Sequence, residues 1–288
     1  MFVLSYQHIY HAGNHADVLK HISLLAILNF LAKKAKPATL IDTHAGSGHY
    51  ALNAPELANN PEYQEGVARL LAHRDNVSDP LLLAYLEQVY AHHQQGFYAG
   101  SVAMMHHWLR EQDQLHASEL HPRAFTELSH TLFKVNAHAY QVDCFAQLKA
   151  LVPPIHKRGL VLIDPPYEDK YEYDQVIQAV SNANNKWATA CYAIWYPLLS
   201  ERAGDKAGLS EQMRDDVARL PVKNAWSIEF RAHPNGHHVG MYGSGMLLLN
   251  CPYQIDEAIS HAMQEVAEIT NISSDDKPIQ TCWHKPPE

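Results

Sequence analysis

The sequence predicts an α/β fold built on a mostly parallel sheet of seven strands. Short apolar segments alternate with helical patterns through most of the chain, which is typical of a parallel sheet with helices on both faces. The first apolar segment leads into a glycine-containing loop, and acidic residues follow several of the segments. With 288 residues, 47% of them hydrophobic, the chain is long enough to bury a complete core.

A long helix and a buried strand account for the N-terminal part of the chain. The helix is expected to start at Asn14 or His15 and to run to about Ala35, because apolar residues recur at helical spacing and Pro37 follows. Residues 38–41 are then expected to form the first strand of the sheet.

The segment 51–97 differs from its surroundings, since it carries helical patterns and loop residues but no strand signals. We therefore predict a small helical subdomain at 51–97, inserted into an α/β domain formed by residues 1–50 and 98–288.

Strands and helices alternate after the insertion. A helix is expected at 101–111, and further helices at 122–129, 144–151 and 173–184. Strands are expected at 116–119, 138–142, 159–163, 191–196, 226–232 and 245–250. The glycine-containing loop 235–240 allows the last two strands to form a hairpin.

Composition excludes several classes of protein. The four cysteines are far apart and form no C-x-x-C pair, so neither a disulfide framework nor a zinc knuckle is expected. The 21 histidines include no H-E-x-x-H motif, and we expect no metal site. The longest apolar stretch, 23–32, is too short to span a membrane, and the N-terminus lacks the pattern of a signal peptide. These features predict a cytoplasmic protein without a membrane partner.

Charge is distributed unevenly along the chain. There are 22 Lys and Arg residues and 31 Asp and Glu residues, a net charge of −9, which argues against binding nucleic acid through a broad cationic surface. Residues 1–36 nevertheless carry four lysines and one acid, a net charge of +3. An RNA is therefore expected to approach this segment, with a shallow dependence of binding on salt.

Acidic residues stand where four of the expected strands end. They are Asp42, Glu119, Asp143 and Asp164. Ligands of open α/β sheets bind beyond the carboxyl ends of the strands, and a nucleoside needs acceptors for its ribose hydroxyls and its amino group. Each feature alone has a simpler explanation. The glycine loop that follows Asp42 would also suit an NAD or FAD protein or a structural turn. Acids at strand ends often cap the helix that follows.

The sharpest motif is Asp164-Pro165-Pro166-Tyr167, directly after the expected strand 159–163. Two consecutive prolines hold a loop rigid and leave its carbonyl oxygens as acceptors. An exocyclic base amine can then donate to the Asp164 carboxylate and the Pro165 carbonyl, while Tyr167 offers a stacking face for a flipped base. The alternative is a rigid turn in which Tyr167 packs in the core.

Taken together, the motifs resemble the RlmJ family of 23S rRNA adenine-N6 methyltransferases. The resemblance rests on Tyr6 and on the strings HAGNHADVLKH (11–21), DTHAGSG (42–48), LREQD (109–113) and IDPPY (163–167). It implies a Rossmann-like class I methyltransferase fold, S-adenosylmethionine as cofactor, 23S rRNA as substrate and no obligate protein partner.

The resemblance also implies roles for individual residues. Cofactor contacts are implied for His21, His44, Ser101, Glu119, Asp143, Cys144 and Asp164, catalytic roles for Asp164, Pro165 and Tyr167, and substrate contact for Tyr6. Two positions depart from the family pattern: Ala99 stands where proline is usual, and Cys144 stands where glycine is usual. The role of Lys20 stays open between a phosphate contact and a solvated helix position.

Two other functions compete with this prediction. A DNA adenine-N6 methyltransferase would use the same motifs, but the chain shows no obvious target-recognition domain. A nucleotide- or RNA-binding module without catalysis would not need a rigid acceptor loop beside its cofactor.

Overall fold

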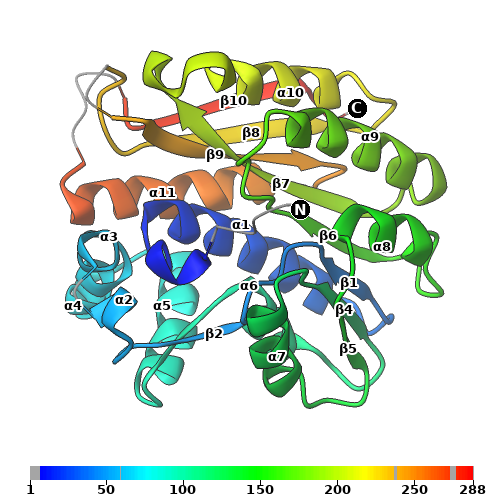
Figure 1. Cartoon of the computed structure of the whole chain (residues 1–288), viewed down its shortest axis with the longest axis horizontal. Coiled ribbons are helices and arrows are strands. Elements are labelled where there is room, and N and C mark those ends of the chain that lie inside the picture. Colours follow the sequence, from blue (N-terminus) through cyan, green and yellow to red (C-terminus); the bar gives the residue numbers. More distant parts are fainter. Residues whose placement is uncertain (1–6, 59, 237–238, 273–276, 288) are drawn as a thin grey trace.

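The computed structural model describes residues 7–58, 60–236, 239–272 and 277–287 (Figure 1). Its centre is an eight-stranded sheet in the order β10-β8-β9-β7-β6-β1-β4-β5. The parallel part comprises β1 (Thr39–Asp42), β4 (Gln114–Ser118), β5 (Ala137–Tyr140), β6 (Gly159–Ile163) and β7 (Cys191–Leu199). The antiparallel part comprises β8 (Ala225–Arg231), β9 (Met241–Leu249) and β10 (Ile279–Lys285).

The predicted fold class is confirmed, and each of the seven predicted strands is present. The eighth strand, β10, was not predicted. It pairs with β8 at the margin of the sheet, and most of its residues are partly exposed. An edge strand of this kind needs no apolar run, so its sequence carries little signal.

The first helix, α1 (His15–Ala32), begins where it was predicted and ends three residues early. The side chain of Asn14 caps it by accepting a hydrogen bond from the backbone N–H of Asp17 at 2.9 Å. By length and composition alone α1 is apolar enough to cross a membrane, but 78% of it is buried inside the molecule. The length and apolar composition of α1 are therefore those of a core helix, which the rest of the molecule covers on nearly all sides.

Helices cover both faces of the sheet. One face carries α1, α6 (Ser101–Trp108) and α11 (Ile255–Thr270), and the other carries α8 (Cys144–Leu151), α9 (Tyr171–Lys186) and α10 (Leu209–Ala218) (Figure 1). The helix α7 (Pro122–Thr131) follows β4. The helices α10 and α11 lie in stretches for which the sequence analysis proposed no element.

The segment 51–97 is helical in the structure. It contains α2 (Pro55–Ala58), α3 (Pro61–Tyr63), a π-helical turn (Gln64–Ala68), α4 (Arg69–Ala72) and α5 (Pro80–His93). Two short strands, β2 (His49–Ala51) and β3 (Phe97–Ala99), pair with each other at its base. Buried residues of this segment share one hydrophobic cluster with α1 and α11, so the segment is packed against the α/β core.

Candidate active site

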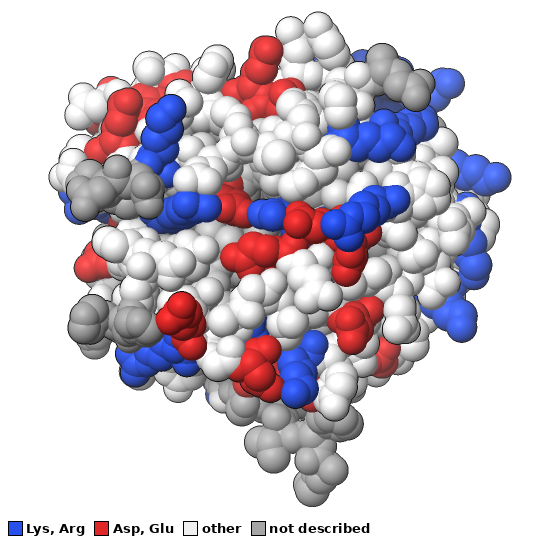
Figure 2. Space-filling model, turned by 90° about the horizontal axis from the view of Figure 1, so that it is seen from above, with Lys and Arg blue, Asp and Glu red and all other residues white. Residues whose placement is uncertain are grey.

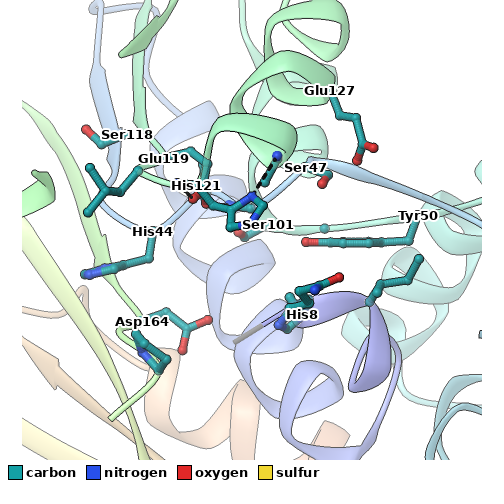
Figure 3. Close-up of a pocket in the computed structure, with 18 of the residues that line it drawn as sticks. His8, His44, Ser47, Tyr50, Ser101, Ser118, Glu119, His121, Glu127 and Asp164 are labelled. Carbon is teal, nitrogen blue, oxygen red and sulfur yellow. Dashed lines mark hydrogen bonds between the residues drawn. The ribbon is translucent and has the colours of Figure 1, made fainter. Parts of the chain in front are cut away.

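Two adjoining cavities lie beyond the carboxyl ends of the parallel strands. The larger has a volume of about 710 Å³ and the smaller about 170 Å³. Both are lined by His8, Lys20, Asp164 and Pro166, so they meet at the loop that follows β6. Figure 3 shows side chains from the ends of β1, β4 and β6 pointing into this region.

The glycine loop after β1 forms one wall of the larger cavity. Gly46 has a φ of +59°, and a Cβ atom there would lie 2.4 Å from the hydroxyl of Tyr50. A side chain at this position would therefore be strained and would collide with its neighbour. The loop needs glycine here to bring its backbone close to a ligand.

The carboxylate of Glu119 joins this loop to the end of β4. Its Oε2 accepts a hydrogen bond from Gly46 N at 3.0 Å, and its Oε1 accepts one from His121 N at 2.6 Å (Figure 3). Burial raises the pKa of Glu119, although these two donors oppose the shift. Glu119 lines the larger cavity.

Asp42 has a supporting role. It is fully buried, and its Oδ2 accepts a hydrogen bond from Ser101 Oγ at 2.7 Å. Ser101 lines the larger cavity, whereas Asp42 does not. The acid at the end of the first strand thus holds Ser101 in place and is not itself placed to meet a ligand.

Burial raises the pKa of Asp42 to about 6, so the folded protein disfavours its ionised form. We expect Asp42→Asn to stabilise the protein at pH 8 by about 3 kcal/mol, because the amide avoids the cost of a buried charge. The folded pKa exceeds the unfolded one, so this cost is absent below pH 3.8 and complete above pH 6. The advantage of the variant, measured by denaturant unfolding, should therefore shrink from pH 8 to pH 4. A pH-independent difference would contradict the prediction.

His44 and Cys144 form a neutral pair on the cavity wall. The Sγ of Cys144 lies 2.9 Å from Nε2 of His44, whose Nδ1 lies 2.8 Å from Thr43 Oγ1. Burial lowers the pKa of His44 to about 4 and raises that of Cys144 to about 12, so neither is charged near neutral pH. The cysteine that departs from the family pattern therefore adds a hydrogen-bonding partner for His44.

Asp143 caps a helix and also lines the larger cavity. Its Oδ1 caps α8 by accepting a hydrogen bond from Ala146 N at 2.8 Å, which is the simpler role considered for such an acid. The residue also lines the larger cavity, beside Cys144.

A buried chain of charges connects α1 to the loop after β6. Lys20 Nζ lies 2.6 Å from Asp164 Oδ2 and 2.8 Å from Asp17 Oδ1. Burial alone would lower the pKa of Lys20, but the two carboxylates hold it well above its usual value. Burial would likewise raise the pKa of Asp17, but His8 and Lys20 hold it well below its usual value. Lys20, whose role was open, is an internal cation that orients Asp164.

The role of Asp17 was not predicted, and His8 was expected only as part of the N-terminal segment that an RNA approaches. His8 Nε2 lies 3.0 Å from Asp17 Oδ2, and His8 lines both cavities. Asp17 lies within the string that carries the family resemblance, and His8 lies three residues before it. No local pattern links either residue to Asp164, which is 144 positions from Lys20.

The stacking role predicted for Tyr167 is not what the structure shows. Its side chain is only 2% exposed, and its hydroxyl donates a hydrogen bond to the carbonyl of Trp195 at 2.8 Å. The ring packs against Tyr173, with 4.6 Å between centroids. Tyr167 borders the smaller cavity, but the alternative of a rigid turn with a core tyrosine describes it better. A buried phenol with a bonded hydroxyl holds the loop rather than offering a free face.

Three further residues differ from the expectation or lie beyond the structure. His21 is fully buried, shares a hydrogen bond with Tyr98 and lines neither cavity, so a cofactor contact is not available to it here. Pro165 is buried and lines neither cavity, which leaves only its carbonyl oxygen for the predicted contact. Tyr6 lies outside the described residues.

The histidines do not assemble into a metal centre in the part of the chain that the structure describes. Within it, no three His, Cys, Asp or Glu side chains are grouped so that they could hold a metal ion.

Comparisons with known proteins agree on one family. The family model described as ribosomal RNA large subunit methyltransferase D, RlmJ, matches residues 35–276. The Escherichia coli protein named ribosomal RNA large subunit methyltransferase J is 36% identical over 265 residues, 91% of this chain and 92% of that protein. Its namesake from Haemophilus influenzae is 36% identical over 259 residues, 88% and 89% of the two chains.

A solved structure agrees with the fold. A Legionella pneumophila protein matches with a TM-score of 0.83 and 32% identity, covering 96% of this chain and 98% of that one.

Proposed function

Because the chain belongs to the RlmJ family of ribosomal RNA large subunit methyltransferases, we propose that it transfers a methyl group from S-adenosylmethionine to N6 of an adenine in 23S rRNA. One observation supports this most directly: a large and a small cavity meet at Asp164. Such an arrangement suits a cofactor on one side of a carboxylate and an acceptor base on the other.

The larger cavity fits the cofactor. Its volume lies within the roughly 300–1,000 Å³ typical of pockets for whole ligands. The close approach at Gly46 and the carboxylate of Glu119 suit a ribose, and Ser101, His44, Asp143 and Cys144 supply further polar contacts along the same wall. When bound, S-adenosylmethionine supplies an electrophilic methyl group on a sulfonium.

The smaller cavity fits the acceptor base. Its volume of about 170 Å³ suits one planar ring system rather than a whole cofactor. Asp164 lies between the two cavities with its carboxylate 15% exposed, so it can accept a hydrogen bond from an amine that enters the smaller one. Bonds to Asp164 and to the Pro165 carbonyl would favour a more tetrahedral nitrogen whose lone pair points toward the methyl group.

Positioning then supplies most of the catalysis. The ion pair with Lys20 keeps Asp164 oriented, which suits an acceptor of a hydrogen bond better than a strong base. The methylated amine is acidic while it is cationic, and Asp164 or solvent can take its proton late. A ribosomal RNA substrate implies that the enzyme works in the cytoplasm.

Calorimetric titration with S-adenosylhomocysteine, followed by methylation of rRNA from cells that lack the gene, tests the proposal. We expect saturable binding and one modified adenine, located by mapping in the large-subunit RNA. A DNA adenine methyltransferase would instead modify duplex DNA, and a binding module would bind the ligand without transferring a methyl group.

Replacing Glu119 tests the cofactor wall. Glu119→Ala should weaken binding of S-adenosylmethionine by about 1.5–3 kcal/mol, the range for hydrogen bonds to a charged group. Glu127→Ala serves as the control, because Glu127 lines the rim of the same cavity and pairs with Arg123 on the surface. Equal affinities of the Glu119 variant and the control, measured by calorimetry on folded protein, would remove Glu119 from the cofactor site.

A further inference from the structure

Among the charged residues that line the larger cavity, acids outnumber Lys and Arg, which presents a problem for an RNA-modifying enzyme. Seven acidic residues line it, against two cations: Glu56, Glu119, Glu127, Asp143, Asp164, Glu168 and Glu172, against Lys20 and Arg123. Lys20 is already paired with Asp17 and Asp164, and Arg123 with Glu127. Phosphates gain little attraction at this mouth, so binding energy for a polyanion has to come from another surface.

Such a surface exists at the opposite edge of the sheet, where the strands begin. Four neighbouring segments there, the end of α9 and the connections into β1, β4 and β6, carry seven cations, which we call the basic edge. Its members are Lys33, Lys34, Lys36, Arg110, Lys157, Arg158 and Lys186. The same segments contain two acids, Glu111 and Asp113, and Asp113 is buried against Arg110 at 2.7 Å.

Hydrogen bonds hold these segments together. Arg110 donates to the carbonyls of Lys34 and Lys36, at 2.9 and 3.1 Å, and Arg158 also donates to the carbonyl of Lys36 at 3.1 Å. The indole of Trp187, next to Lys186, donates to the carbonyl of Lys157 at 2.9 Å. The cations therefore form one continuous surface, although they come from distant parts of the sequence.

The two arginines and the lysines of the basic edge differ in what they do. Arg158 donates to a carbonyl in the last turn of α1, where the helix dipole is negative, and Arg110 donates to carbonyls of the turn that follows, so both have a structural role. Both guanidinium groups donate to the carbonyl of Lys36, so like charges are close together, and burial with the charge of Arg110 lowers the pKa of Arg158. The five lysines are exposed, so their charges face solvent.

The space-filling view agrees with this distribution. In Figure 2 the right-hand margin, on the side where α9 ends in Figure 1, shows Lys and Arg side chains without Asp or Glu among them. In the middle of the same face, blue and red side chains alternate.

We propose that the basic edge binds the phosphate backbone of the substrate RNA, at a segment outside the one that presents the target adenine. The two regions are joined by α1: thirteen residues separate Lys20 from Lys33, and at roughly 1.5 Å per residue this is about 20 Å along the helix. A structured RNA whose adenine enters the smaller cavity reaches the basic edge only if it continues around the flank of the enzyme. The earlier expectation of a shallow salt dependence is thereby revised, because local rather than net charge sets the number of phosphate contacts.

The inference rests on the proposed function, and its test separates the two. The variant Lys33→Gln/Lys34→Gln/Lys36→Gln keeps both arginines and removes three exposed charges. The control Lys170→Gln/Lys223→Gln/Lys277→Gln removes three exposed lysines outside the basic edge. Binding is measured over a range of salt concentrations with two RNAs: a 23S rRNA transcript, and a fragment that ends within a few base pairs of the mapped adenine.

On the transcript, the edge variant should lose affinity by roughly tenfold or more at low salt, and the slope of log affinity against log salt should become shallower by about two to three. On the short fragment, the edge variant and the wild type should bind and methylate alike, and affinity for S-adenosylhomocysteine should not change. The control should behave as wild type throughout.

Other outcomes decide against one proposal or the other. If the edge variant binds the transcript with wild-type affinity and slope, the basic edge does not hold this RNA and the inference is wrong. If the control variant loses as much affinity for the transcript as the edge variant, the loss is caused by the change in net charge and the inference is wrong. If the wild type itself methylates neither RNA, the proposed function fails instead.

Discussion

Asp164→Ala should lower the rate of methyl transfer by about 10²–10⁴-fold while leaving the fold and most of the cofactor affinity intact. The variant removes the acceptor that orients the amine between the two cavities. The fold should survive because Lys20 keeps its second partner, Asp17, at 2.8 Å. Single-turnover methylation of rRNA, together with calorimetric titration of S-adenosylhomocysteine, measures the two effects separately.

Asp164→Asn distinguishes the two possible roles of this carboxylate. The amide oxygen still accepts a hydrogen bond from the amine but is far too weak a base to take its proton. Partial activity would therefore favour orientation, whereas an Asn variant as inactive as the Ala variant would favour proton abstraction or a need for the ion pair with Lys20. Turnover near the wild-type rate in Asp164→Ala would exclude the residue from the mechanism.

Lys20→Met should produce the largest loss of stability. The change removes the cation that lies between two carboxylates and leaves the buried Asp17 without its lysine partner. Breaking a buried ion pair by deleting one partner typically costs about 3–5 kcal/mol in the free energy of unfolding. Denaturant unfolding at pH 7 measures this cost, and Lys33→Met at the exposed end of the same helix is the matched control, expected within about 0.5 kcal/mol of wild type.

The pH dependence of this loss follows from the directions of the pKa shifts. The folded pKa of Asp17 is depressed, so its contribution is present above its ordinary pKa of 3.8 and is lost as the pH falls. The folded pKa of Lys20 is raised, so its contribution is present below its ordinary pKa of 10.5 and is lost as the pH rises. The difference between wild type and Lys20→Met should therefore be largest between pH 3.8 and pH 10.5, and it should shrink below pH 3.8 as the wild type loses the contribution of Asp17. A difference that grows on acidification would mean that Lys20 does not stabilise ionised carboxylates.

The fold was largely predictable because its signals are local. The cap at Asn14, the apolar run of β6 and the boundaries of α8 each depend on a few neighbouring residues, and the structure has them where the sequence indicated. The two-stranded pair at the base of the insertion and the edge strand β10 were missed, since short or exposed strands lack an apolar pattern.

The candidate site was predictable only in part. Glu119 and Asp164 reach the cavities because each stands at the end of a strand that an open α/β sheet brings to the same edge, whereas Ser101 was implied only by the family resemblance. A motif does not show in which direction its side chains point. Tyr167 was therefore predicted to stack on a base, whereas its ring packs in the core.

The sequence by itself therefore determined the α/β architecture, the glycine loop, the position of Asp164 and, through its motifs, the family. The tertiary structure alone decided which charges meet. It buried Lys20 between Asp17 and Asp164, and it collected cations from four segments of the chain into the basic edge. The reason is physical: turns, caps and strand patterns are set by neighbours along the chain, whereas the energy of a charge depends on burial and on partners that only packing brings within a few ångströms.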